Sequence, residues 1–306
     1  MSLLLYVTVV LIWGTTWIAI VMQQGVVDPT VSVFYRFVLA AGVLMVTLLL
    51  SGRLKPLRGR DHLWCLAQGA SVFCLNFYCF YHAVSYISSG MEAVIFSMAV
   101  LFNALSSALF FRQPIKRGFW LAALLGLSGM LTLFWPELAS ANPEPGLFIG
   151  IGLSLLGTYC FSLGNMISAR HQRHGLDLWT TNGWGMSYGA LFTGLLVVGQ
   201  GLPLTLDTRP SYLGALLYLA LFGSIVAFAA YFQLLKRIGA SQAAYSTLLF
   251  PLVALSVSTL FEDYHWQLSS VLGMVLILVG NLAMFPHLLR WPLSRLTRPA
   301  LDSATR

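Results

Sequence analysis

Residues 4–22, LLYVTVVLIWGTTWIAIVM, contain no charged side chain and are long enough to cross a bilayer as one helix. Similar apolar segments recur along the chain, separated by short stretches that hold glycine, proline and charged residues. Hydropathy predicts ten spans, near residues 4–22, 30–50, 62–84, 89–111, 117–135, 147–169, 178–199, 211–235, 238–260 and 267–289. Because Met1 and Ser2 supply no charged n-region, we expect the first span to be retained rather than cleaved as a signal peptide.

The composition excludes most soluble classes of protein. Of 306 residues, 58% are hydrophobic and 9% are charged, whereas an average soluble domain carries about 25% charged residues. Such a chain is neither a disordered protein, nor a nucleic-acid-binding domain with a solvated basic surface, nor an ordinary cytosolic enzyme. The expected fold class is an all-α integral membrane protein. The four cysteines lie in apolar runs without a CxxC pair, so neither a disulfide nor a metal site is expected.

The basic residues predict the orientation in the membrane. If the N-terminus is cytoplasmic, fifteen of the 17 Lys and Arg residues fall in inner loops or the C-terminal tail, Arg209 is outside, and Arg36 lies within a span. The positive-inside rule then places both termini in the cytoplasm. The net charge of +7 thus reflects topology rather than a nucleic-acid partner. We expect a multi-pass protein of the plasma membrane, in a bacterium the inner membrane.

The two halves of the chain resemble each other. An offset of 150 residues aligns Tyr81 with Tyr231 and Phe111 with Phe261, and an offset of 151 residues aligns Gly129 with Gly280. This pattern predicts a five-helix repeat at 1–136, a second at 147–290, and a basic cytoplasmic tail at 291–306. Because five is odd, the second repeat must be inverted, which is typical of secondary transporters with a substrate site at the repeat interface.

Other functional classes fit less well. No GxxxxGK[ST] motif is present, so we expect transport without ATP. The GxSG at Gly126–Gly129 resembles that of rhomboid-type intramembrane proteases, but Ser128 lies mid-helix with no strained turn to expose its hydroxyl. We therefore do not expect an enzyme. A membrane sensor without transport would need a soluble output domain or a partner-binding tail, and the short basic tail fits anchoring instead.

Several short motifs resemble a known family. Leu11–Trp17 (LIWGTTW), Arg36-Phe37 with Ala40, Gly239–Ser241 leading to Pro251, and Phe261-Glu262 resemble the EamA type of the drug/metabolite transporter superfamily. The resemblance implies ten helices in two inverted five-helix copies and export of amino acids or related metabolites without ATP. The first copy departs from the second, with Leu101 in place of Pro251, Arg112 in place of Glu262, and Glu92 in place of Gln242.

Glu92 and Arg36 are the most informative polar residues, because ionisable groups within spans are costly and mark function by default. At 1.5 Å per residue, Arg36 lies roughly 9 Å and Glu92 roughly 5 Å below the outer boundary. The two could form an ion pair in an outward-facing vestibule, where an amino acid would offer a carboxylate to Arg36 and an ammonium group to Glu92. A purely structural salt bridge, or an Arg36 that snorkels to the interface, is the alternative.

Helical spacing adds further candidates. Trp13 and Trp17 lie i,i+4 apart, Tyr78 and His82 share one face of the span near 62–84, and Ser162 and Asn165 belong to a polar stripe on the sixth span, near 147–169. Polar stripes on membrane helices must face protein or water. His82 is also a candidate proton carrier. Interhelical hydrogen bonding and core packing remain alternatives for all of these side chains. The full candidate substrate-binding set is Glu92, Arg36, Trp13, Trp17, Tyr78, His82, Asn103, Tyr159, Ser162, Asn165, Gln242 and Tyr245.

The sequence therefore predicts a secondary transporter of small organic metabolites, most of all amino acids, that exports them by alternating access. Its expected partners are the small-molecule substrate and the lipid bilayer, with no cofactor. Coupling to protons and a homodimer stay open, as does the direction of transport. A multidrug efflux permease and a non-transporting sensor are the alternative functions.

Overall fold

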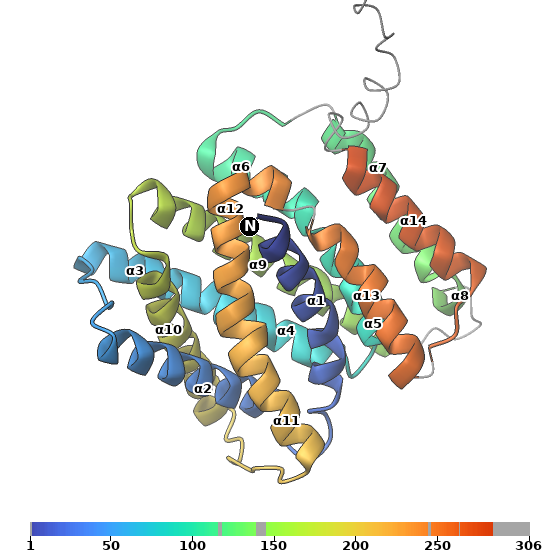
Figure 1. The fold of residues 1–306 in the computed structure, drawn as a ribbon. Coiled ribbons are helices and arrows are strands. Elements are labelled where there is room, and N and C mark those ends of the chain that lie inside the picture. The colour runs from blue at the N-terminus through green and yellow to red at the C-terminus, as the bar shows by residue number, and fades with distance from the viewer. Residues whose placement is uncertain (1, 116–117, 139–144, 244–245, 263, 284–306) are drawn as a thin grey trace, which may run out of the picture.

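A computed structural model describes residues 2–115, 118–138, 145–243, 246–262 and 264–283 (Figure 1). Every regular element in these ranges is helical. The α-helices are α1 (Ser2–Val21), α2 (Pro29–Leu50), α3 (Gly59–Gln68), α4 (Asn76–Ala83), α5 (Ser89–Phe96), α6 (Ala99–Phe111), α7 (Gly118–Leu133), α8 (Trp135–Leu138), α9 (Pro145–Arg173), α10 (Leu178–Gly199), α11 (Pro210–Tyr218), α12 (Ala227–Ala243), α13 (Ser246–Phe261) and α14 (Leu268–Ala283). Two π-helical segments, η1 (Gly69–Leu75) and η2 (Leu219–Val226), join α3 to α4 and α11 to α12.

The helices have the length and apolar character of membrane spans, which confirms the predicted fold class. Within the described ranges, six helical stretches are long and apolar enough to cross a bilayer: Leu4–Val21, Pro29–Leu50, Gly59–Ala83, Ser89–Phe111, Pro145–Arg173 and Pro210–Arg237. Three shorter apolar helices, Gly118–Leu133, Leu249–Phe261 and Leu268–Leu282, accompany them. Each predicted span contains a helix of the structure, while the number of ten membrane crossings stays a prediction.

One predicted boundary is wrong. The break expected at Lys236-Arg237 is helical, because α12 continues to Ala243 and α13 begins at Ser246. Lysine and arginine are good helix formers, so their charge marks the end of the apolar stretch without ending the helix.

The predicted span 89–111 is interrupted between α5 and α6. The break falls at Ser97, whose hydroxyl donates to the carbonyl of Val94 at 2.7 Å. Asn281 of α14 donates to the carbonyl of Ser97 at 3.1 Å. A side chain from the far end of the sequence thus satisfies a backbone group near the break, as a buried carbonyl requires.

The π-helical segments repeat at the offset seen in the sequence. η1 begins at Gly69 and η2 at Leu219, 150 residues further along the chain. π-Helical turns are rare and are frequent at functional sites. Two such segments at matching positions are consistent with duplication of the chain.

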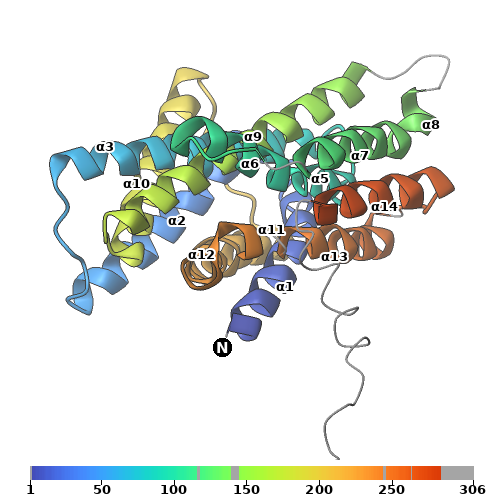
Figure 2. The ribbon, with the colours of Figure 1, turned by 90° about the horizontal axis from the view of Figure 1, so that it is seen from above.

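Helix packing also follows the two halves. In the central part, α1 packs against α12 and α13, and α9 packs against α4 and α6. On one side of the molecule α2 lies against α10, and on the other side α7 lies against α14, as both views show (Figure 1, Figure 2). Each contact joins a helix of the first half to one of the second, so the centre of the bundle lies between the halves.

The α7–α14 contact depends on glycine. A Cβ atom added at Gly129 would lie 2.6 Å from the carbonyl oxygen of Gly273 and 2.7 Å from a side-chain carbon of Ile277. Real Cβ atoms do not approach a backbone oxygen this closely, so a side chain at Gly129 would force the helices apart. Close contact through small residues is the usual way in which helices associate in membranes.

We expect Gly129→Leu to lower the unfolding temperature by roughly 5 °C or more, because overpacking of a tight contact costs about 1–3 kcal/mol. Thermal unfolding in detergent measures the effect. Gly152→Leu is the matched control, since a Cβ at Gly152 would meet nothing within 4 Å. Equal unfolding temperatures for the two variants would contradict the close α7–α14 contact.

A short loop before α11 is fixed by one ion pair. Arg209 donates through its backbone N–H and its Nε to the two carboxylate oxygens of Asp207, at 2.9 and 2.6 Å. These hydrogen bonds, the backbone bond first, hold the pKa of the Asp207 carboxyl below its usual value. Arg209 Nη2 also donates to the carbonyl of Gln24, so the loop is tied to the turn after α1.

Candidate functional site

A small buried cavity lies at the centre of the bundle, between the two halves of the chain. Its volume is about 30 Å³, enough for one or two water molecules but not for an organic solute. The central cavity is therefore too small for a solute in this conformation. Its lining residues come from α1, α2, α4, α5, α9 and α12: Trp13, Thr16, Trp17, Ile20, Arg36, Asn76, Phe77, Phe80, Phe96, Phe161 and Phe228.

Arg36 is the one charged residue in this lining. Its side chain is 1% exposed, and its Nε donates to the hydroxyl of Ser224 in η2 at 3.0 Å. Its Nη1 lies 3.4 Å from the Tyr81 hydroxyl, and its guanidinium carbon lies 4.2 Å from the centre of the Phe77 ring. No carboxylate oxygen of the described residues lies within 4 Å of Arg36.

This environment leaves the positive charge of Arg36 without a counter-ion in the described part of the chain. Hydroxyl groups and ring faces solvate a guanidinium only in part. Removing a charge from water costs several kcal/mol unless an opposite charge compensates for it. A negatively charged group placed in the cavity would offset that cost, so the site has the electrostatics of an anion-binding site.

The hydrogen bonds around Arg36 join both halves of the chain. Tyr81 of α4 donates to Gln23 Oε1 at 2.8 Å, and Ser224 of η2 donates to the carbonyl of Leu219 at 3.0 Å. Each group that holds Arg36 is thus held by a partner of its own. The guanidinium is therefore fixed in place rather than free to snorkel to the membrane surface.

The two tryptophans predicted from i,i+4 spacing both line the cavity. Trp13 donates from Nε1 to the carbonyl of Gly223 in η2 at 3.1 Å. Trp17 is 5% exposed, and its Nε1 has no hydrogen-bond partner among the described residues. A buried N–H normally finds an acceptor. Trp17 is therefore an available donor on a residue that lines the cavity.

Aromatic rings close the rest of the cavity. The Trp17 ring lies 5.1 Å from Phe80 and 5.5 Å from Phe96, while Trp13 lies 5.0 Å from Phe228 and 5.8 Å from Phe161. Most of these pairs meet edge to face, the favoured geometry for aromatic rings. A solute can enter only if some of these contacts separate.

The expected ion pair between Arg36 and Glu92 is wrong. Arg36 is held by η2 and α4, as described above, whereas Glu92 of α5 lies against α9 and α13. Depth along the helix axes placed the two residues at similar levels but did not fix the directions in which their side chains point. Glu92 is also absent from the cavity lining, although Phe96, one turn further along, belongs to it.

Glu92 has an unusual environment of its own. It is fully buried, and its Oε1 accepts a hydrogen bond from Ser154 at 3.4 Å. Its Oε2 has no hydrogen-bond partner among the described residues. The carboxylate of Glu262 accepts hydrogen bonds from the backbone N–H and the hydroxyl of Ser89, which lies one turn before Glu92 on α5. Burial of a charged carboxylate with incomplete hydrogen bonding is costly, which makes Glu92 a candidate proton carrier.

The polar stripe predicted on the sixth span joins helices rather than facing the cavity. Asn165 donates to Asn103 at 3.2 Å, and Ser162 donates to Ser106 at 2.9 Å, so α9 and α6 are linked by hydrogen bonds. Tyr159 packs with its ring 5.7 Å from that of Phe102. Asn103, Tyr159, Ser162 and Asn165 are therefore not part of the cavity wall in this conformation.

Tyr78 and His82 share a face of α4, as their spacing predicts, but this face is not the cavity side. Their rings lie 4.4 Å apart, and His82 Nε2 is 3.2 Å from the hydroxyl of Thr30 in α2. Of the remaining candidates, the side chain of Gln242 and the whole of Tyr245 lie outside the described residues.

Sequence reasoning missed several lining residues. Three of them are Asn76, Phe77 and Phe80, which lie on the side of α4 opposite to Tyr78 and His82. Asn76 also donates a hydrogen bond to the carbonyl of Gly157 at 2.9 Å. The sequence held one signal for this side of the helix, the alignment of Tyr81 with Tyr231 between the two halves. Tyr81 accepts a hydrogen bond from Arg36, and the ring of Tyr231 lies 5.0 Å from that of Trp13. In the described ranges no group of His, Cys, Asp and Glu residues could hold a metal ion.

A multi-pass helical membrane protein with a central cavity between two similar halves has the architecture of a transporter. A family model described as the EamA-like transporter family matches residues 1–135 and again residues 142–285. The chain therefore belongs to the EamA-like transporter family, which confirms its resemblance to the drug/metabolite transporters of EamA type.

Individual relatives agree with this assignment. The chain is 28% identical to protein PecM of Dickeya dadantii, with 90% of each chain covered, and 24% identical to protein PagO of Salmonella typhimurium, again with 90% of each covered. It is 28% identical to the uncharacterized inner membrane transporter YedA of Escherichia coli K12, covering 88% of this chain and 87% of that one. A crystal structure of another protein, 17% identical, superposes with a TM-score of 0.68 over 97% of this chain and 99% of the other, and so has the same fold.

Proposed function

We propose that this transporter exports small organic solutes that carry a carboxylate, most of all amino acids with apolar side chains. Transport proceeds by alternating access without ATP, across a bacterial inner membrane, with both termini in the cytoplasm. The asymmetry of Lys and Arg between the loops supports this orientation.

Arg36 is the observation that carries the proposal. A guanidinium with no acidic partner among the described residues borders the central cavity, and a carboxylate fits its two terminal nitrogens in a fork geometry. Trp17, which also lines the cavity and has an available N–H, would add a further donor. A positively charged solute would be repelled by the same group.

The aromatic lining supports an apolar solute side chain. Seven of the eleven lining residues are Trp or Phe, and ligand sites of this kind combine apolar walls with a few placed polar groups. An amino acid would place its carboxylate at Arg36 and its side chain among the rings. The polar groups available for a sugar or nucleotide, Thr16 and Asn76, are too few to match either.

The small size of the cavity supports alternating access. Because the cavity holds only one or two waters, the aromatic contacts must open toward one membrane face to admit the solute and toward the other to release it. The contacts of α1 with α12 and α13 correspond to those of α9 with α4 and α6 in the other half. Two such equivalent sets of contacts allow the same site to open in two ways.

Counterflow in proteoliposomes tests this proposal. Vesicles preloaded with one unlabelled solute from a panel of amino acids, purines and cationic dyes are diluted into the labelled form of the same solute. We expect accumulation of labelled apolar amino acids and none of cationic dyes. The control is a set of vesicles that contain the Gly152→Leu variant, which is expected to transport normally.

Each other outcome has a clear meaning. Counterflow of cationic dyes without amino acids would replace the proposal with a multidrug efflux function. Absence of counterflow for the whole panel, with folded protein in the vesicles, would contradict amino-acid transport and favour a different metabolite or a sensor.

A further inference from the structure

A second and larger pocket lies at the end of the bundle where α3 begins and α9 ends. Its volume is about 400 Å³, within the range of ligand-binding pockets. We call it the Arg58 pocket. Its lining residues are Pro56, Arg58, Arg60, Asp61, Arg170, His174 and Leu176. None of them belongs to the central cavity.

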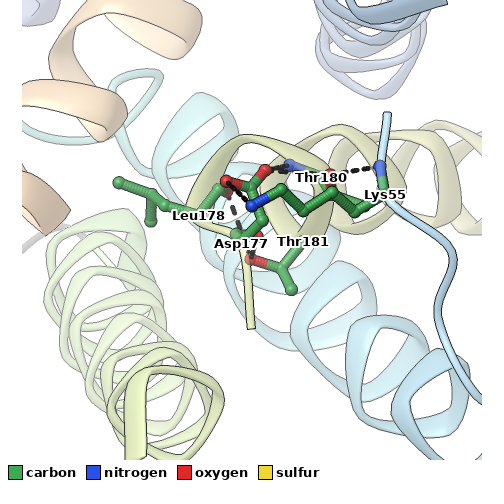
Figure 3. A network of polar contacts seen from close by, with 5 residues as sticks. All are labelled: Lys55, Asp177, Leu178, Thr180 and Thr181. Atoms are coloured by element: carbon green, nitrogen blue, oxygen red, sulfur yellow. Dashed lines mark hydrogen bonds and ion pairs between the residues drawn. The ribbon is translucent and has the colours of Figure 1, made fainter. Parts of the chain in front are cut away.

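The walls of the Arg58 pocket are held together by the polar network in Figure 3. The backbone N–H of Lys55 donates to the Thr180 hydroxyl at 3.1 Å, and the Lys55 ammonium lies 3.9 Å from Asp177. Asp177 in turn accepts hydrogen bonds from Thr180 at the start of α10. The loop that carries Pro56 and Arg58 is thus fixed against the turn that carries His174 and Leu176.

The charge of the pocket is positive. Arg170 is 13% exposed in its side chain, lies 3.5 Å from Asp61, and has its guanidinium carbon 4.6 Å from the centre of the Trp64 ring. Arg58 and Arg60 have no acidic partner within 4 Å among the described residues. The lining therefore contains three arginines and one aspartate, and Arg170 packs against the ring of Trp64.

The backbone adds to this preference for an anion. Arg58 is the N-cap residue of α3, without a side-chain capping bond, so the pocket lies at the positive end of the helix dipole. His174 Nδ1 is 2.9 Å from the carbonyl of Arg170, so when Nδ1 donates this bond the other ring nitrogen stays available to a ligand. Arginine side chains combined with a helix N-terminus are typical of phosphate recognition.

Apolar side chains continue from the pocket along the surface of α3. Leu63 is 66% exposed and Leu66 is 37% exposed, one and two turns from Arg60. In a membrane such side chains contact lipid acyl chains. A phosphate bound in the Arg58 pocket would therefore sit directly above an acyl-chain surface, the arrangement that a phospholipid requires.

We propose that the Arg58 pocket binds a phosphate ester, the anion that acidic phospholipids present at the membrane surface and that small phosphorylated solutes carry in water. The site is separate from the central cavity, so it does not depend on the identity of the transported solute. Basic pockets between membrane helices on the face that carries most Lys and Arg have the chemistry to bind acidic headgroups.

Native mass spectrometry in a neutral detergent tests the proposal by counting bound phosphatidylglycerol and phosphatidylcholine as each lipid is titrated. We expect the double variant Arg58→Gln with Arg60→Gln to bind phosphatidylglycerol roughly 30-fold more weakly. The charge-matched control, Lys236→Gln with Arg237→Gln, removes two exposed positive charges from α12 and should bind within about threefold of the wild type. All four positions are exposed, so neither variant disturbs the core.

Competition by glycerol 3-phosphate separates the two sources of phosphate. Displacement of phosphatidylglycerol at millimolar concentration would show that the pocket accepts a soluble phosphate ester, and no displacement would show that it requires the lipid. Equal weakening in the two double variants would overturn the proposal, because the lipid would then respond to surface charge alone. Equal binding of phosphatidylcholine and phosphatidylglycerol by the wild type would also overturn it.

Discussion

Arg36→Gln is expected to lower the apparent affinity for a carboxylate-bearing solute by about 100-fold, which corresponds to the loss of roughly 3 kcal/mol of charge-assisted hydrogen bonding. At working concentrations counterflow would fall to background. The reason is that, among the described residues, Arg36 is the one positive charge in the cavity lining, so none of the other described lining residues compensates the solute carboxylate. Counterflow of the solute at several concentrations measures the change.

A comparison of stability separates this role from a structural one. If Arg36 serves packing alone, its replacement should lower the unfolding temperature and leave transport intact in the folded fraction. If Arg36 instead binds the solute carboxylate, Arg36→Gln removes a buried charge that has no counter-ion among the described residues. The unfolding temperature of the variant should then stay unchanged or rise. Arg53→Gln is the control, because Arg53 is exposed and outside both pockets. Wild-type transport by folded Arg36→Gln protein would contradict the assignment.

Glu92→Gln is expected to abolish the response of transport to a pH gradient while sparing exchange of solute for solute. Glu92 is fully buried and has one carboxylate oxygen without a hydrogen-bond partner among the described residues. Glutamine keeps the shape of the side chain and the contact with Ser154, but it cannot gain or lose a proton at neutral pH. Transport driven by the pH gradient should therefore stop, while exchange of solute for solute continues. Solute flux driven by an imposed pH gradient and counterflow without a gradient measure the two steps separately.

Glu262→Gln is the matched comparison, since the Glu262 carboxylate is already occupied by two hydrogen bonds from Ser89. We expect this variant to keep part of its pH response. Unchanged pH dependence in Glu92→Gln would show that Glu92 carries no proton, and loss of exchange together with coupling would instead place it in the solute path.

The spans could be predicted from sequence because membrane helices need long apolar stretches, and hydropathy measures that property directly. The break near Ser97 and the π-helical segments could not, because neither changes the apolar content of the chain. They depend on contacts between distant segments, such as the hydrogen bond from Asn281 to the carbonyl of Ser97. The end of α12 beyond Arg237 was missed because charge marks the membrane surface rather than the helix terminus.

The candidate site was predicted in part. Arg36, Trp13 and Trp17 could be predicted because a charged side chain and two tryptophans one turn apart stand out within apolar spans, and all three line the cavity. Glu92 was paired with Arg36 wrongly, since depth along a helix does not specify the side of the helix from which a residue projects. The phenylalanines of the lining, Phe80 and Phe161 among them, carry no sequence signal in a chain with 20 Phe residues.

The most direct measurement compares three solutes that differ only at the carboxylate: an apolar amino acid such as leucine, its amide, and the amine left by decarboxylation. Each is tested for counterflow in vesicles that contain the wild-type protein. Binding of the carboxylate at Arg36 predicts exchange of leucine and at least about 100-fold slower exchange of leucinamide and 3-methylbutylamine. Exchange of the amide or the amine as fast as leucine would contradict it.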